Sequence, residues 1–510
     1  MNTQMFSSQK SQTLTTNKAG GAAYKTTPAS ALARYAVTGC FNNLFYANAE
    51  TQMEEVKKLI AHVNDEFIAK LAVYARKNGL MKDFPAFLLA VLCARNTSLL
   101  EKVFPKVIDS PKMLRNFVQI IRSGQVGRKS FGSKPKKLIQ KYLESLSDEQ
   151  VFKADIGNSP SLQDIIKMVH PKPSSKSREN LYAYLLDKKY DKELLLNIVK
   201  EFEKFKKTGE GDVKDVPFQM LTSQNLSNDN WKTIAENATW NQLRMNLNSF
   251  YKHGVFFSDS LVQKAFDKLS NAVEVKKSKT FPYQLFAAYL NVDPNLPSKL
   301  VEAINLALET STENVPKLEG NVYICLDISG SMGDSATGNR GTATSKMRFI
   351  DIASLFTSTL IRNNPNTKLI VFNGSAKEVS LSPNETVLNN AKKLSSMLSG
   401  GTDCAKPLEL MNVKNHKADL IIYFSDNQSW MSNSFYGKTS MQNEWNKFKT
   451  NNPSAKLICM DIAPYGDSQV IKDESVLNIG GFSDTIFNLT QLFHYGAIDS
   501  FEEVINNVEI

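Results

Sequence analysis

Residues 320–333 read Gly-Asn-Val-Tyr-Ile-Cys-Leu-Asp-Ile-Ser-Gly-Ser-Met-Gly. Within this stretch, residues 322–326 form a short apolar run, which is typical of a buried parallel strand. The run ends at a carboxylate, Asp327, and two hydroxyls follow at alternate positions, Ser329 and Ser331. A buried strand that ends in this way presents hard oxygen donors at one point. Such donors suit Mg²⁺, Mn²⁺ or Ca²⁺ rather than zinc.

Two later segments complete this candidate site. Residues 399–403 form a glycine loop that carries Thr402, and residues 418–424 are a second apolar run, closely followed by Asp426. In a doubly wound sheet of strand order 3-2-1-4-5-6, strands 1 and 4 are neighbours, and ligands bind at their carboxyl ends. If the two apolar runs are strands 1 and 4, Asp327 and Asp426 converge at that edge. The sequence therefore predicts a divalent cation there, Mg²⁺ first and Mn²⁺ or Ca²⁺ as alternatives.

The order of these pieces resembles the metal-ion-dependent adhesion site of von Willebrand factor A domains, in which Asp-x-Ser-x-Ser precedes a loop threonine and a strand-terminal aspartate. The resemblance implies that the serines and the threonine bind the metal directly, and that the aspartates act mostly through water. One departure is Asn427, because the family often has glycine there, and the turn could differ. A simple turn after a strand is the alternative for the Asp-Ser-Ser piece alone. The predicted ligands are Asp327, Ser329, Ser331, Thr402 and Asp426.

Length and composition are those of an ordinary globular protein with several domains. At 510 residues the chain has room for about two to four domains. No apolar run approaches the ~20 residues that span a bilayer, and the polar N-terminus lacks the apolar core of a signal peptide. The five cysteines are scattered, fit no zinc spacing and are odd in number, which argues against a disulfide framework. We therefore expect a cytoplasmic protein without membrane association.

The net charge of +10 is unevenly distributed along the chain. Residues 1–310 carry 44 basic and 30 acidic side chains, whereas residues 311–510 carry 17 and 21. A basic first part and a mildly acidic second part indicate that binding of a polyanion belongs to the first. The alternative is a lysine-rich proteome in which this charge serves no special partner.

Helical periodicity dominates the first part of the chain. Apolar residues recur at i, i+3, i+4 and i+7 in several segments, among them those that begin at Ile68, Phe84 and Leu162. Helix follows helix from residue 28 to about residue 309 with no clear strand. This length is too great for a single bundle and predicts an α-solenoid of stacked helix pairs.

Beyond the helical part, strand-like runs alternate with helical segments, which predicts an α/β doubly wound domain. The further strands expected are 368–372, 418–424 and 456–462, and the helices are 347–361, 385–397 and 441–449. The predicted organisation is a disordered tail of residues 1–17, a helical domain of residues 18–310, a linker of residues 311–320 and the α/β domain of residues 321–510.

A basic segment stands out within the helical part. Its glycines indicate a loop, and Pro135 at a helix start would leave free backbone N–H groups beside the lysines. Amides, a helix N-terminus and lysines together form a phosphate-binding site. For Phe131, anchoring the loop in the core is favoured over stacking on a base. Residues 122–141 contain no acidic residue and seven basic ones, namely Arg122, Arg128, Lys129, Lys134, Lys136, Lys137 and Lys141.

A single histidine, His170, ends a predicted helix farther along, and Lys172 follows it. A cation is favoured at a helix C-terminus, so the histidine could simply cap the helix. It could also contact phosphate or stack on a base. Taken by itself, the residue favours the capping interpretation.

Several stretches resemble the TROVE module of Ro (SS-A) autoantigen-type ribonucleoproteins. The family joins a ring of HEAT-like helical repeats to a C-terminal von Willebrand A domain, and this chain has both in that order. The matching stretches are residues 19–24, 36–42, 71–76, 127–132 and 168–173. The resemblance covers nearly the whole chain, and the combination of the two modules is more specific than either motif.

This resemblance implies a function in RNA biology. It implies that Y RNAs, which are small non-coding RNAs, bind the outer surface of a basic ring. It also implies that single-stranded 3′ ends of misfolded RNAs pass through the hole of the ring. In bacteria the family works with a 3′ exonuclease. By match, the RNA-binding region includes Arg122, Arg128, Lys129, Lys134, Lys136, Lys137, His170 and Lys172.

The leading hypothesis is therefore a non-enzymatic RNA-binding protein for small-RNA binding and RNA quality control, with no DNA partner. A second hypothesis is a protein-interaction scaffold without RNA function, whose metal takes its sixth ligand from a partner's acidic side chain. A third is an Mg²⁺-dependent hydrolase with Asp327 as nucleophile. The third is disfavoured because Ser329 stands where such phosphatases typically need a second aspartate, and because the sequence offers no paired general acid and base.

Overall fold

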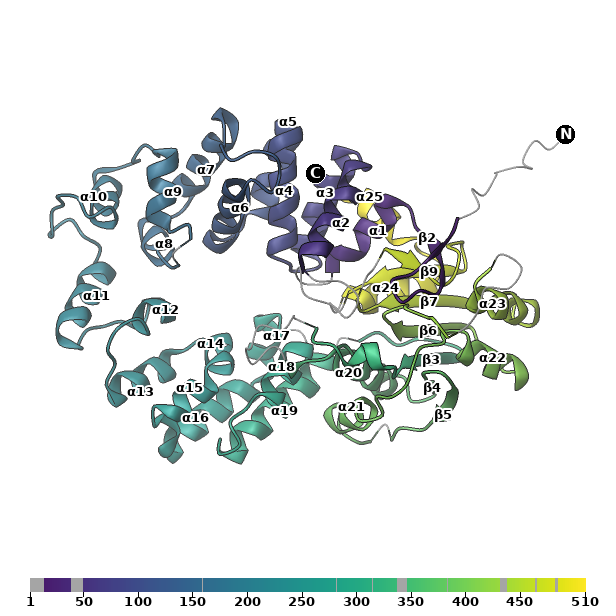
Figure 1. Cartoon of the computed structure of the whole chain (residues 1–510). Coiled ribbons are helices and arrows are strands. Elements are labelled where there is room, and N and C mark those ends of the chain that lie inside the picture. Colours follow the sequence, from purple (N-terminus) through teal and green to yellow (C-terminus); the bar gives the residue numbers. More distant parts are fainter. Residues whose placement is uncertain are drawn as a thin grey trace. The chain divides into compact units, whose positions relative to one another are not determined.

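The computed structural model (Figure 1) describes residues 13–37, 49–157, 159–280, 282–313, 315–336, 346–382, 384–431, 438–463, 466–481 and 485–510. Every helix in these ranges is too short or too polar for a membrane span. The described residues divide into two compact units. The α/β unit comprises the described residues up to Phe67, residues 78–80 and residues 312–508. The helical unit comprises residues 68–77, 81–311 and 509–510.

A six-stranded sheet forms the centre of the α/β unit. Its strands are β3 (Val322–Asp327), β4 (Lys368–Phe372), β5 (Ala376–Val379), β6 (Leu420–Ser425), β7 (Lys456–Asp461) and β9 (Val476–Gly480). They lie in the order β5-β4-β3-β6-β7-β9. When the six strands of this sheet are numbered along the chain, this is the predicted order 3-2-1-4-5-6. All neighbours pair in parallel except β5, which is antiparallel to β4. The strands predicted from the sequence are confirmed, and β5 and β9 are additional edge strands.

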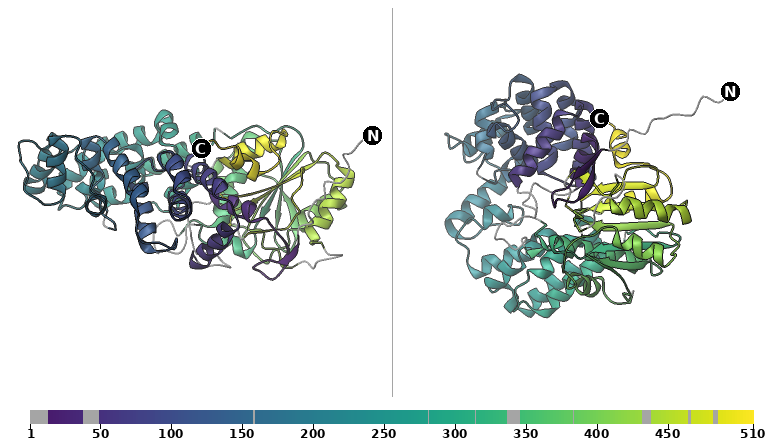
Figure 2. Two further views of the ribbon diagram at one scale, coloured as in Figure 1. Left: turned by 90° about the horizontal axis from the view of Figure 1, so that it is seen from above. Right: turned by 45° about the vertical axis from the view of Figure 1, so that its right-hand side comes forward.

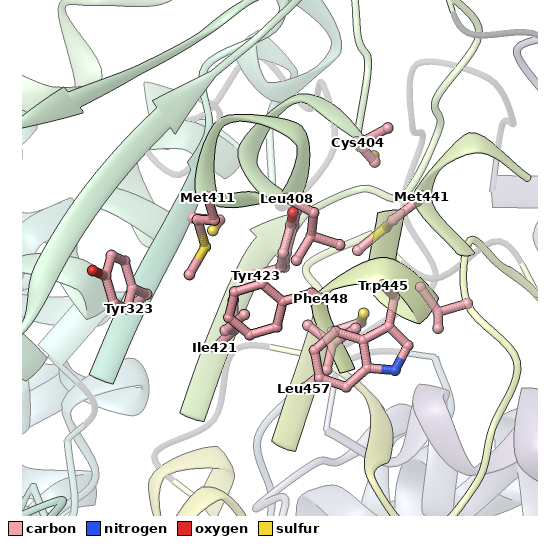
Figure 3. Packing of buried hydrophobic residues seen from close by; sticks show 14 of the residues in the cluster. Tyr323, Cys404, Leu408, Met411, Ile421, Tyr423, Met441, Trp445, Phe448 and Leu457 are labelled. Atoms are coloured by element: carbon pink, nitrogen blue, oxygen red, sulfur yellow. The ribbon is translucent and has the colours of Figure 1, made fainter. Parts of the chain in front are cut away.

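Helices cover both faces of this sheet (Figure 2). On one face lie α22 (Lys406–Val413) and α23 (Ser440–Asn451). Trp445 and Phe448 of α23 pack with Tyr423 of β6 in one buried cluster (Figure 3). The next residue of β6, Phe424, points to the opposite face because side chains alternate along a strand, and there it meets Phe356. Phe356 belongs to α20 (Phe349–Asn363) and also contacts Phe487 of α24 (Thr485–His494). Beside α20 packs α21 (Val387–Ser395), and α25 (Phe501–Asn506) follows α24.

The N-terminal segment belongs to the α/β unit, which corrects the predicted domain boundaries. Strand β1 (Leu14–Thr16) pairs with β2 (Ala22–Lys25), and β2 pairs with β8 (Asp467–Ser468), all antiparallel. Ala23 and Tyr24 are buried. The expected disordered tail of residues 1–17 therefore ends in a strand, while its first twelve residues lie outside the described ranges. The strand escaped prediction because its three residues are all exposed and show no apolar alternation.

Three short helical elements follow this hairpin: α1 (Pro28–Arg34), η1 (Tyr35–Val37) and α2 (Ala49–Ala61). The first two pack against β9, and α1 also packs against α25 and α2. The helical domain expected at residues 18–310 therefore begins only within α3 (Asp65–Lys77), because the preceding segment buries its apolar side chains in the α/β unit. Most of the TROVE-like stretch at residues 36–42 lies outside the described residues.

The helical unit consists of short helices that pack on their neighbours in chain order. Helix α4 packs against α5 and α6, α5 against α7, and α6 and α7 against α9. The three predicted apolar stripes, from Ile68, Phe84 and Leu162, lie on α3, α4 and α9 and are buried. This confirms stacked helices, whereas closure into a ring stays a prediction. The first helices are α4 (Asp83–Arg95), α5 (Thr97–Val107), α6 (Pro111–Ser123), α7 (Ser133–Ser145), α8 (Asp148–Lys153), α9 (Leu162–Val169), α10 (Lys176–Leu185) and α11 (Asn197–Thr208).

The remaining elements of the helical unit follow α11 in the chain and precede β3. They are α12 (Phe218–Leu221), α13 (Asn228–Asn237), α14 (Trp240–Met245), α15 (Leu247–Lys252), η2 (Val255–Phe257), α16 (Asp259–Ser270), α17 (Ala272–Ser278), α18 (Pro282–Leu290) and α19 (Ser298–Thr312). The linker expected at residues 311–320 is instead a packed segment: α19 extends into it, and Leu318 is buried. The Leu318 backbone N–H donates to Asn364 Oδ1 at 2.7 Å, which ties this segment to the end of α20.

Candidate metal centre and candidate RNA-binding surface

The sheet register brings the two predicted aspartates to one edge. In the parallel pairing of β3 with β6, Leu326 lies opposite Phe424, so Asp327 and Asp426 leave neighbouring strands at nearly the same level. After Asp327 the chain turns sharply, because the backbone N–H of Ser329 donates to Asp327 Oδ1 at 2.8 Å. The hydroxyls of Ser329 and Ser331 are then 3.3 Å apart at the start of η3 (Gly330–Gly333). These side chains meet as the sequence predicts.

The glycine loop joins this turn through its backbone. Ser399 N–H donates to the carbonyl of Ile328 at 2.7 Å, and Gly330 N–H donates to the carbonyl of Gly400 at 2.9 Å. Gly400 has a φ of +79°, a conformation that glycine adopts without strain. Thr402, in the same loop, is buried, and its carbonyl accepts from the N–H groups of residues 430 and 431. All five predicted ligands are therefore buried at one edge of the sheet.

Electrostatics at this edge favour a cation. Burial raises the pKa of Asp327. Burial, and next the charge of Asp327, raise the pKa of Asp426 to about 7. Among the described residues, the hydrogen-bond partners of the two carboxylates are hydroxyls and backbone amides, such as Ser425 Oγ, which donates to Asp327 Oδ2 at 2.6 Å. Two buried carboxylates to which no described cationic side chain donates, together with neutral hydroxyls, form a donor set that fits a hard divalent ion.

The ligand set depends on its hydroxyls. No group of three His, Cys, Asp or Glu residues suited to a metal occurs within the described ranges. Asn427, the residue at which the sequence departs from the family pattern, adopts the left-handed conformation with φ +57°. Asparagine tolerates that region better than other residues with a side chain. An asparagine in place of glycine is therefore compatible with the backbone conformation at this position.

In the helical unit, the loop of the basic segment runs from the end of α6 to Gly132, the N-cap of α7. Phe131 is buried, which confirms its predicted anchoring role. Helix α7 begins at Ser133, earlier than expected, and Pro135 lies buried within its first turn. The N-cap residue of α7, Gly132, makes no side-chain capping hydrogen bond, and the first amides of a helix have no partner within the helix itself, as a phosphate site requires.

The predicted basic residues of this loop differ in their availability. Arg128 is half-buried and donates to the carbonyls of Cys93 and Ser130, at 2.8 and 2.7 Å, so it holds the loop in place. Lys134 pairs with Glu101 at 3.4 Å. In the loop and the first turns of α7, Lys129, Lys136 and Lys137 are exposed and make no ion pair with another described residue, and the same holds for Lys141 farther along α7.

A groove between α6 and α9 lies near this segment. It has a volume of about 600 Å³ and contains Arg122, whose Nη1 is 3.0 Å from Met168 Sδ. It also contains the exposed Lys167, which the sequence analysis did not single out because a lone lysine in an amphipathic helix carries no distinguishing signal. The groove is lined by Gln119, Arg122, Ser123, Ser159, Pro160, Asp164, Lys167 and Met168.

His170 occupies the C-cap position of α9, in the left-handed conformation with φ +51°. The cap itself is made by its backbone N–H, which donates to the carbonyl of Ile166 at 2.9 Å. Gln140 Nε2 donates to the carbonyls of Val169 and His170. The side chain of His170 is exposed, as is that of Lys172. The imidazole is therefore not needed for the capping hydrogen bonds and faces solvent.

The fold and the oxygen-rich edge define the class: a stacked-helix unit joined to a von Willebrand A domain with the Asp-x-Ser-x-Ser pattern. Residues 321–494 match the family described as the Ro60 von Willebrand A domain. The RNA-binding protein RO60 of Deinococcus radiodurans is 22% identical over 457 residues, which cover 81% of this chain and 83% of that protein. The crystal structure of the Ro (RSR) protein of Deinococcus radiodurans has a TM-score of 0.62 at 16% identity, covering 92% of this chain and all of that one. The C-terminal domain thus matches the Ro60 type, and most of the chain is similar to these Ro proteins.

Proposed function

We propose that the protein binds small non-coding RNA of the Y-RNA type through the basic surface of its helical unit. The observation that carries this proposal is the match, over 81% of the chain, to a protein named as RNA-binding. RNA binding requires contacts to phosphate. The helical unit offers them through three exposed lysines that form no ion pair with another described residue, through the uncapped start of α7 and through the groove with Arg122 and Lys167.

The same proposal extends to RNA quality control. The protein would bind single-stranded 3′ ends of misfolded RNAs and tether them to a 3′ exonuclease, acting as a binding protein and not as an enzyme. We place this role in the cytoplasm, in agreement with the four described cysteines, which are unpaired.

For the edge of the sheet we propose one Mg²⁺ ion, or alternatively Mn²⁺ or Ca²⁺, bound by Asp327, Ser329, Ser331, Thr402 and Asp426. Such an ion is a Lewis acid with few negative ligands, and it would accept an external carboxylate. The residues hold their hydroxyls and carboxylates in place through backbone hydrogen bonds. We therefore propose that this centre docks an acidic side chain of a protein partner.

Sequencing of the RNA that co-purifies with the native protein tests the main proposal. A discrete, structured small RNA is the expected result. Recovery of bulk ribosomal fragments only, or of no RNA, contradicts the proposal and favours the protein-interaction scaffold. The Lys129→Ala, Lys136→Ala, Lys137→Ala triple variant purified in the same way is the matched sample, and it should lose the enriched RNA.

The three unpaired lysines should determine the salt dependence of RNA binding. Replacing Lys129, Lys136 and Lys137 by alanine should make the slope of log K against log salt shallower by about two to three units. Each lysine that no longer contacts a phosphate reduces the number of counterions that the RNA releases on binding. Filter binding at several salt concentrations measures the slope. The matched control replaces Lys188, Lys189 and Lys192, exposed lysines of the same unit, and should leave the slope unchanged. Equal effects of the two triple variants would show that only net charge matters.

His170 should contribute to RNA binding through its imidazole and not through capping. His170→Asn keeps a residue that tolerates the left-handed conformation, so the melting temperature should stay nearly constant. Loss of a stacking surface should weaken binding of a Y-RNA-like hairpin by about 1–3 kcal/mol. His170→Ser is the companion variant. If RNA binding and thermal stability fall together in both variants, His170 only caps the helix.

A further inference from the structure

The turn of the N-terminal hairpin lies against the loop that follows Asp426. The Asn17 side chain is buried between the two: its Nδ2 donates to the carbonyl of Ser429 at 2.7 Å, and its Oδ1 accepts from the N–H of Gly21 at 2.8 Å. The backbone N–H of Lys18 donates to Gln428 Oε1 at 2.9 Å. A Cβ atom on Gly21 would lie 1.9 Å from the carbonyl oxygen of Ser429, so this approach requires glycine.

The loop held by this hairpin contacts both halves of the metal centre. On one side, the N–H of Gln428 donates to Asp426 Oδ1 at 3.1 Å. On the other side, Ser429 Oγ accepts from the N–H of Cys404 at 3.1 Å. The N–H groups of residues 430 and 431 donate to the Thr402 carbonyl. The position of Ser429 is therefore linked to an aspartate ligand and to the threonine loop at once.

We infer that the N-terminal hairpin is a positioning element of the metal centre: Asn17 and Gly21 hold residues 428–429 so that Asp426 and Thr402 meet one ion. This inference rests on the metal centre proposed above. It has a reciprocal consequence, because two equilibria that share one loop must affect each other by the same factor. A bound ion should hold the hairpin more tightly, and a loosened hairpin should weaken binding of the ion.

Other contacts keep the hairpin attached when Asn17 is changed. Strand β2 pairs with β8, Thr26 Oγ1 donates to the carbonyl of Gly466 at 2.7 Å, and the N–H of Thr439 donates to Tyr24 Oη at 3.3 Å. An Asn17→Ala protein should therefore fold, and a change in metal affinity can be separated from a loss of structure.

The experiment measures Mn²⁺ binding to the full chain by titration calorimetry. Asn17→Ala and Gly21→Ala should each weaken Mn²⁺ binding by about tenfold or more, as is usual when a group that orients a metal ligand is lost. Thr15→Ala, on the exposed β1 of the same hairpin, is the matched control and should bind as the parent does. Parental affinity in Asn17→Ala would overturn the inference while leaving the metal centre itself in place.

A second readout does not depend on a mutation in the hairpin. Hydrogen exchange of the Gly21 amide in the parent protein should slow when Mn²⁺ is added, and it should not respond in a protein carrying Asp327→Ala. No metal-dependent protection in a parent that binds Mn²⁺ would overturn the inference. If the parent binds no Mn²⁺ at all, the proposed centre fails and the inference fails with it.

Discussion

A protein with Asp327→Ala and Ser329→Ala should bind no stoichiometric divalent metal. The double change removes two of the five predicted ligands, Asp327 and Ser329. Both side chains are buried, and Asp327 is one of the two carboxylates of the site. Elemental analysis and Mn²⁺ titration measure the loss. The parent should gain about 2.7 kcal/mol of stability when free Mn²⁺ is 100 times its dissociation constant, and the variant should gain nothing.

The control for this experiment uses the same residue types elsewhere in the α/β unit. Asp499→Ala with Ser380→Ala removes an exposed aspartate and an exposed serine and should leave metal binding unchanged. RNA affinity should be the same in all three proteins, because the proposed RNA contacts lie in the helical unit. Retained stoichiometric metal in the Asp327→Ala, Ser329→Ala protein contradicts the assigned site. Metal lost together with strongly weakened RNA binding contradicts the separation of the two functions.

Arg34→Met should destabilise the α/β unit by about 3–5 kcal/mol. Arg34, at the end of α1, is 1% exposed, and its Nη1 lies 3.5 Å from Oδ2 of the equally buried Asp461. Burial raises the pKa of Asp461 well above its usual range, and the charge of Arg34 opposes this shift. Without the guanidinium, a buried carboxylate at the end of β7 loses its cation. Differential scanning calorimetry and urea denaturation measure the free energy of unfolding.

A second mutation separates the ion pair from the packing of the arginine side chain. Asp461→Asn added to Arg34→Met removes the uncompensated charge and should recover part of the loss, which a double-mutant cycle expresses as a coupling energy. Lys25→Met is the matched control, because Lys25 is an exposed cation on the same N-terminal segment and should change stability by less than about 0.5 kcal/mol. A cost below about 1 kcal/mol for Arg34→Met would show that the ion pair contributes little.

The sequence predicts the sheet and the meeting of the five candidate ligand residues at its edge, because both depend on local patterns. Asp327 and Asp426 each follow an apolar run, and parallel strands necessarily bring their carboxyl ends to one edge. The helical part is predicted for a similar reason, since its apolar stripes repeat within single helices. Element ends shift by a few residues, as for α7, where the uncapped Ser133 and not Pro135 begins the helix.

The features that escaped prediction depend on contacts between distant residues. In the sequence, Arg34 is indistinguishable from an ordinary surface cation, and only the fold places it beside Asp461. Asn17 and Ser429, which are joined by a hydrogen bond, are 412 positions apart in the sequence. The availability of each basic residue is also a tertiary property. Arg128 and Lys129 are adjacent and similar in sequence, yet only the first is engaged by backbone carbonyls. No local pattern distinguishes such cases.

The pairing of the first strands with β8 imposes an order on synthesis. Thr26 and its partner Gly466 are separated by 440 positions, so the hairpin leaves the ribosome long before the residues that it contacts exist. At about 5–20 residues per second, this delay is roughly 20–90 s. During that time the parts of α1 and β2 that contact α25, β9 and β8 have no partner, while the helical unit, which lies between the hairpin and β8 in the chain, can already fold. The α/β unit is therefore completed only after the helical unit has been synthesised, and until then the hairpin is available to chaperones.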